Sequence, residues 1–226
     1  MGDLAMTTDP FLNAGDFEQE CHQEEWARAI DICQERLALG QDTRYWKLQL
    51  GLVNFLWEGN IDAHDIAAAR ILKELAEEFP SDPEVLFWTA YVIYITTEPD
   101  EFVLNLLARA LDLDPSHAYA NLLTAGYLQF SNKAAEAYTF LRRALETQPG
   151  NRRILRQIMV LASQLGRSDD VISAANSVLN TEPYVERSMS CMNEYANDVL
   201  AGYNDTVDIT RLARRAIETG GKVVLN

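Results

Sequence analysis

Residues 137–149 read AYTFLRRALETQP and give the first indication of how the chain folds. Ala137, Leu141 and Ala144 stand at positions i, i+4 and i+7, so their side chains form one apolar stripe along a helix. Pro149 ends that helix, because proline lacks a backbone N–H and forces the preceding residue out of helical geometry. The segment therefore predicts an amphipathic helix that stops at a turn.

The same pattern returns along the chain at a regular interval. Pro115 precedes Pro149 by 34 residues, and Pro183 follows Pro149 by another 34. Apolar stripes with the same spacing stand before four prolines: Ala68, Leu72 and Leu75 before Pro80; Val103, Leu107 and Ala110 before Pro115; Ala137, Leu141 and Ala144 before Pro149; and Val171, Ala175 and Val178 before Pro183. Segments 29–40 and 209–221 follow the pattern without a proline, and further apolar-periodic stretches lie between these helices. A fixed period of this length predicts stacked antiparallel helix pairs.

This arrangement resembles the tetratricopeptide repeat (TPR) family, in which helix pairs of about 34 residues stack into a right-handed superhelix. Residues that match the family pattern are Leu50 with Gly51 and Thr124 with Ala125 at the helix crossing, then Ala137, Ala144 and Pro149. Tyr91 and Met159 depart from it, since a small residue is usual there, and the turn between Trp57 and Ile66 is about five residues too long. The resemblance spans roughly residues 26–221 and implies an all-α fold, an α-α superhelix.

The period also predicts the organisation of the chain, as one continuous domain. Four repeats are expected at about 43–82, 83–117, 118–151 and 152–183. An irregular N-terminal segment and helix pair precedes them at 1–42, and a degenerate capping helix pair follows at 184–226. Stacking is required because one helix pair cannot bury its apolar stripe alone.

The charge balance excludes several classes of partner. Lys and Arg total 19 against 34 Asp and Glu, a formal net charge of −15 at pH 7. Such a surface repels a phosphate backbone, so no nucleic-acid partner is expected. The sequence shows neither an 18-residue apolar span nor a signal segment, which predicts a cytoplasmic protein without membrane insertion. The acidic excess lies mainly in residues 1–100, where it forms either a solvated face or a surface that steers a basic partner.

Motifs for catalysis or cofactor binding are missing from the sequence. There is no P-loop, no G-x-S-x-G, no H-E-x-x-H and no G-x-G-x-x-G after a strand. The cysteines, Cys21, Cys33 and Cys191, have no CxxC spacing, and the histidines, His22, His64 and His117, fall in different helix pairs at helix ends or in loops. We therefore expect no enzyme activity, no cofactor and no metal site.

A partner-binding groove is implied by the family resemblance, because the first helix of each pair lines the concave face of a TPR superhelix. Helical spacing then gives these groove candidates: Tyr45, Leu48, Leu52, Phe55, Val85, Trp88, Val92, Tyr119, Leu122, Gln129, Arg153, Arg156, Val160, Arg187, Ser190 and Glu194. The predicted groove begins apolar and aromatic and ends with arginines, to which Arg152, Arg142 and Arg143 could add. It fits another protein, presented as a peptide or helix with apolar anchors and carboxylates.

The aromatic candidates have a second interpretation as core residues. Tyr45, Leu48, Trp88 and Val92 could be covered by residues 9–23, whose Phe11, Leu12 and Phe17 could fold back over them. Sequence reasoning leaves this alternative open.

Three functions are compatible with these features. The first is a non-catalytic interaction module, an adaptor or scaffold that binds a partner segment in the groove. The second is a secretion-type or assembly chaperone that holds a client protein. The third is a self-assembling scaffold, because the apolar residues 223–225 could let copies stack end to end.

Overall fold

The computed structural model describes residues 17, 19–21, 25–57, 61–96, 101–180 and 209–223. Within these ranges the regular structure is helical and consists of α2 (Trp26–Ala38), α3 (Thr43–Leu56), α4 (Ile61–Glu78), α5 (Pro83–Thr96), α6 (Glu101–Leu113), α7 (Ala118–Phe130), α8 (Ala134–Thr147), α9 (Arg152–Gln164), α10 (Ser168–Asn180) and α12 (Ile209–Glu218). None of the described helices combines the length and the apolar character needed to cross a bilayer.

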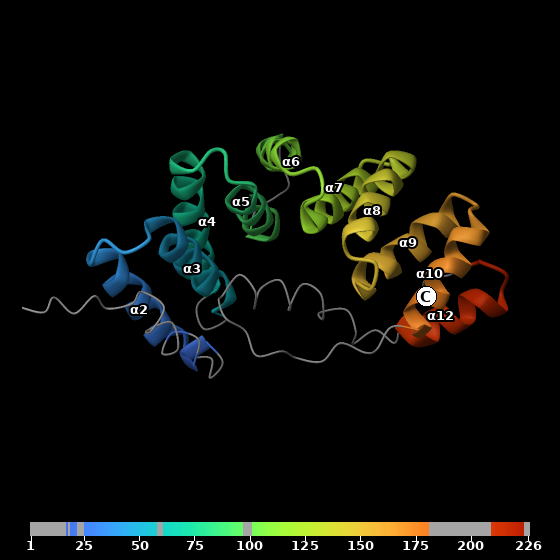
Figure 1. The fold of residues 1–226 in the computed structure, drawn as a ribbon, viewed down its shortest axis with the longest axis horizontal. Coiled ribbons are helices and arrows are strands. Elements are labelled where there is room, and N and C mark those ends of the chain that lie inside the picture. Colours follow the sequence, from blue (N-terminus) through green and yellow to red (C-terminus); the bar gives the residue numbers. More distant parts are fainter. Residues whose placement is uncertain are drawn as a thin grey trace, which may run out of the picture.

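The helices stack in sequential pairs. Contact is most extensive within α3–α4, α5–α6, α7–α8 and α9–α10, and each pair also contacts the next. Figure 1 shows the pairs following one another along a curved path, from α2 and α3 at one end to α10 and α12 at the other. The structure confirms the all-α fold as a TPR-like solenoid. The division into four family repeats stays a prediction.

The apolar stripes that precede the prolines form the core of the stack. Each stripe residue on α4, α6, α8 and α10 has at most 1% of its surface exposed: Ala68, Leu72, Leu75, Val103, Leu107, Ala110, Ala137, Leu141, Ala144, Val171, Ala175 and Val178. The i, i+4, i+7 spacing thus correctly identified the buried face of every second helix.

Gly51 allows α3 and α4 to approach closely. A Cβ atom at this position would stand 2.6 Å from Leu72 Cδ2, well inside van der Waals contact. Leu72 is fully buried and has little room to move. The small residue that the family pattern requires at the crossing therefore has a direct steric reason.

Polar side chains set the starts of the first helices. The Tyr45 N–H donates to Asp42 Oδ1 before α3 (3.0 Å), and the Ile154 N–H donates to Asn151 Oδ1 before α9 (3.2 Å). Before α7, the Ala120 N–H donates to Nδ1 of His117 (3.2 Å). These bonds satisfy N–H groups that have no partner within the helix.

The long turn expected between Trp57 and Ile66 is partly helix. Helix α4 begins at Ile61, so the additional residues extend it at its N-terminus. His64 consequently lies in the first turn of α4, at a helix end and not in a loop. Its Nδ1 is 3.0 Å from Asn54 Oδ1, and its ring stacks on Trp57 with centroids 3.9 Å apart.

A chain of polar contacts links three successive first helices. The Arg44 guanidinium of α3 donates to Asp82, which precedes α5 (2.8 Å), and His117 Nε2, before α7, donates to Glu84 of α5 (3.1 Å). Trp88 Nε1 also donates to Glu84 (2.7 Å). Burial raises the pKa of Asp82, but the hydrogen bonds from Arg44 and from backbone N–H groups outweigh burial and hold it below its ordinary value. Burial also raises the pKa of Glu84, but the interactions with His117 and the hydrogen bond from Trp88 outweigh burial and lower it.

Candidate partner-binding groove

A pocket of about 280 Å³ lies where α5, α7 and α9 meet. Its walls combine rings, aliphatic side chains, two amides and one guanidinium: Phe87, Tyr91, Tyr94, Tyr119, Leu122, Leu123, Gly126, Gln129, Phe130, Arg153 and Gln157. All of these residues belong to the first helices of their pairs. The hollow therefore lies between first helices of successive pairs.

Helical spacing explains how each helix contributes to the pocket. On α5, Phe87, Tyr91 and Tyr94 follow one another at intervals of four and three residues, so they share a face. Arg153 and Gln157 are four residues apart at the start of α9. The Asn151 side chain fixes this start, because it accepts from the Arg153 N–H at 3.0 Å.

Aromatic rings pack against each other along the apolar side of the pocket. Phe87 is 1% exposed, and its ring centroid lies 6.2 Å from that of Tyr119 and 6.0 Å from that of Tyr91. Tyr91 also meets Phe55 of α3 edge to face, with centroids 5.8 Å apart. Contacts of this kind favour edge-to-face or offset arrangements of the rings.

The opposite side of the pocket is polar. Arg153 carries the formal charge among the lining residues, and Gln129 and Gln157 supply amide groups that can donate and accept. Burial raises the pKa of Tyr94, and the positive charge of Arg153 opposes that rise, so the guanidinium acts across the pocket from α9 to α5.

The structure brings only some of the predicted groove residues to this pocket. Tyr119, Leu122, Gln129 and Arg153 line it. Four other candidates are half-buried and do not line the pocket: Tyr45 and Phe55 on α3, and Arg156 and Val160 on α9. The Arg156 Nε has no hydrogen-bond partner among the described residues. Arg187, Ser190 and Glu194 lie outside the described residues.

Other groove candidates are core residues, which corrects the groove interpretation for them. The side chains with no exposed surface are Leu48, Leu52, Val85, Trp88 and Val92. Helix α5 is buried continuously from Val85 to Ala90, because its own pair covers one side and the neighbouring pairs cover others. The alternative interpretation as core is thus correct for Leu48, Trp88 and Val92.

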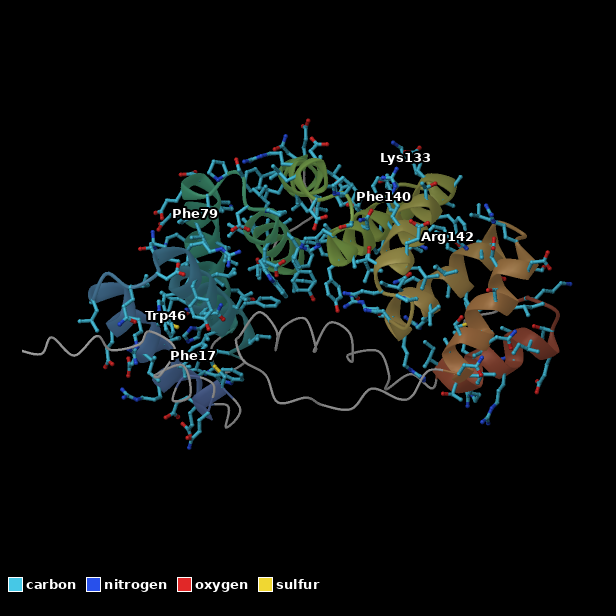
Figure 2. All side chains as sticks on the ribbon, viewed as in Figure 1. Phe17, Trp46, Phe79, Lys133, Phe140 and Arg142 are labelled. Atoms are coloured by element: carbon cyan, nitrogen blue, oxygen red, sulfur yellow. The ribbon has the colours of Figure 1, made fainter. Side chains whose placement is uncertain are left out.

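The proposed cover from the N-terminal segment is only partly visible. Phe17 is fully buried and meets Trp46 of α3 edge to face, with ring centroids 5.5 Å apart (Figure 2). It therefore packs at the α3 end and does not line the pocket between α5, α7 and α9. Phe11 and Leu12 lie outside the described residues.

None of the three additional arginines is among the residues that line the pocket. Arg152 is 9% exposed, and its guanidinium donates to the Val178 carbonyl (3.3 Å) and to Thr210 Oγ1 (3.1 Å), which ties α9 to α10 and α12. Arg142 lies 3.8 Å from Asp170 of α10, and Arg143 stands over the Phe140 ring at 5.4 Å.

Sequence reasoning missed several lining residues, and two of them had a signal. Tyr91 occupies a position where the family pattern has a small residue, and Gly126 directly follows the expected small residue Ala125. Both residues line the pocket. Phe87, Tyr94 and Phe130 carried no comparable signal.

Fold and groove together define a class of protein: an all-α, TPR-like solenoid with a pocket on its first helices. No family model matches the sequence. Among solved structures, the fold is similar to the crystal structure of MamA, with 15% identity and a TM-score of 0.57 over 75% of this chain and 90% of that one. It is also similar to MamA MSR-1 C2 (12% identity, TM-score 0.52, 82% and 98% covered) and to MamA 41-end from Desulfovibrio magneticus RS-1 (18%, 0.50, 75% and 96%). At these identities the likeness concerns the fold.

Proposed function

We propose that this protein is a non-catalytic interaction module that binds a segment of another protein in the groove formed by α5, α7 and α9. The observation that carries the proposal is the pocket between these helices, which combines aromatic rings with polar side chains that include Arg153. Tyr, Phe and Arg side chains in a partly desolvated pocket are typical of protein-binding surfaces.

The construction of the groove supports this role. Its side chains come from three consecutive pairs, whereas the buried stripes of α6, α8 and α10 hold the stack together. The buried stripes therefore lie outside the groove, whereas Phe87 and Leu122 both line the pocket and belong to the core.

A capture experiment tests the proposal. Wild-type protein and an Arg153→Glu, Gln157→Glu double variant are used as baits with native lysate, after circular dichroism has shown equal helicity. Arg143→Glu is the matched control, because it reverses one charge on the exposed side of α8, away from the pocket. We expect a protein that the wild type and the control retain and the double variant loses. Equal retention by all three baits would contradict the proposed groove.

The self-assembling scaffold receives no support from the described C-terminus. Val223 is partly buried against the core of its own chain, and its N–H donates to Ser163 Oγ at 2.9 Å. Residues 224–226 lie outside the described residues.

A further inference from the structure

We infer that the pocket between α5, α7 and α9 receives one aromatic side chain of the partner, and that a carboxylate beside that side chain pairs with Arg153. This inference rests on the proposed function and specifies its chemistry. It concerns the occupant of the pocket, which is a segment of another protein.

The size of the pocket suits a single ring. A closed apolar cavity of about 150 Å³ accepts benzene, whereas sites for drug-sized ligands span about 300–1,000 Å³. The volume of about 280 Å³ lies between these limits. One aromatic side chain with its first backbone atoms therefore suits the space.

Gly126 keeps the space open. A Cβ atom added there would meet no atom within 4 Å, so the packing of α7 does not require glycine at this position. Glycine in a helix interior is about 1 kcal/mol less favourable than alanine, which makes an unpacked helical glycine a net loss to the fold. The contrast is Gly51, where a side chain would collide with Leu72. We attribute the open space at Gly126 to the incoming side chain.

The walls can hold a ring from several sides. Tyr91 and Tyr119 flank the buried Phe87, and an additional ring can meet them edge to face. Phe130, at the last position of α7, is 81% exposed although it lines the pocket. A bound ring would bury part of this side chain, which favours binding through the apolar area removed from water.

Charge complementarity selects the group beside the ring. Arg153 provides the formal charge of the lining set, and a guanidinium pairs with a carboxylate through two parallel hydrogen bonds. Gln129 and Gln157 have donors and acceptors that suit the backbone of a peptide. The expected ligand is therefore an aromatic residue with Asp, Glu or a terminal carboxylate close to it.

A displayed library of random twelve-residue peptides tests the inference on the full chain. After selection on the wild type, the affinities of enriched peptides are measured for the wild type, Gly126→Leu, Arg153→Gln and the Arg143→Glu control. We expect enrichment of an aromatic residue with a neighbouring acid. Gly126→Leu, whose side chain fills the pocket, should weaken binding at least tenfold, and Arg143→Glu should leave it unchanged.

A coupling measurement tests the carboxylate separately. Changing the acid of an enriched peptide to its amide should weaken binding to the wild type at least fivefold and have little effect on binding to Arg153→Gln, because the partner of the carboxylate is then already missing. An equal loss with both proteins would overturn the assigned pair.

Other outcomes separate this inference from the proposed function. If Gly126→Leu retains both the peptides and the lysate partner, while Arg153→Glu, Gln157→Glu loses that partner, the aromatic pocket is refuted and the groove stands. Enrichment without an aromatic residue, or no enrichment, also refutes the pocket.

If the oligomeric mass in sedimentation falls on Gly126→Leu substitution, the occupant is a second copy, and the inference of a separate partner is wrong. Thermal unfolding of Gly126→Leu at or above the wild-type temperature shows that lost binding is not lost folding.

Discussion

Alanine substitutions at two helical glycines should change stability in opposite directions. In an exposed or open helix interior, Gly→Ala stabilises by up to about 1 kcal/mol, because glycine loses more backbone freedom on folding. At Gly126 a Cβ atom meets nothing within 4 Å, so the whole gain should be realised. We expect Gly126→Ala to raise the free energy of unfolding by about 1 kcal/mol.

The same substitution at Gly51 introduces a collision. The new Cβ would lie 2.6 Å from Leu72 Cδ2 and 2.7 Å from Leu72 Cγ, in a fully buried part of the core. Overpacking of this kind typically destabilises by about 1–3 kcal/mol. After the helix-propensity gain, Gly51→Ala should lower the free energy of unfolding by up to about 2 kcal/mol.

Urea unfolding followed by circular dichroism measures both changes, provided that the slope m is the same for wild type and variants. Thermal unfolding provides a second readout, since about 1 kcal/mol corresponds to a shift of roughly 2–4 °C for a chain of this length. Stabilisation of both variants by the same amount would show that α3 and α4 do not cross as closely as the structure has them. Destabilisation by Gly126→Ala would show that the space beside α7 is filled.

Three further predictions concern the links within the stack. The pKa values of Asp82 and Glu84 are lowered, so both carboxylates stabilise the fold at neutral pH and lose this contribution as the pH falls through their folded-state pKa values. The urea concentration at the unfolding midpoint should therefore decrease when the pH is lowered beneath about 5. This decrease should be smaller in Glu84→Gln than in the wild type. Arg152→Ala removes the hydrogen bonds to α10 and α12 and should cost about 1–3 kcal/mol, with faster amide exchange in residues 209–218 as the local readout. Trp88→Ala should destabilise by about 3–5 kcal/mol and reduce partner capture only to the extent that it unfolds the chain, which capture at a temperature where the variant is fully folded will check.

Much of the fold was predictable because the relevant signal is local. Leu141 lies one turn from Ala137 and almost one from Ala144, so their spacing alone places them on one helical face, and the structure buries all three. Pro149 ends its helix through its own covalent structure. The pattern at Gly51 likewise predicted a helix crossing, which the approach of Leu72 explains.

The candidate site was less predictable, because exposure depends on neighbours that are distant in sequence. Trp88 and Tyr91 are both large aromatic residues on α5, yet Trp88 is fully buried and Tyr91 lines the pocket. Spacing along one helix cannot separate them, since the adjoining helix pairs determine which side chains they cover.

The sequence by itself thus determined the helix pairs and their buried stripes, since i, i+4, i+7 spacing and proline stops act within one helix. Only the tertiary structure decided that α5, α7 and α9 leave a hollow beside Gly126, and that Arg153 faces it while Arg152 binds α10 and α12. The physical reason is that adjacent side chains on a helix point about 100° apart. Whether each meets solvent, a pocket or a neighbouring helix is settled by how the pairs stack.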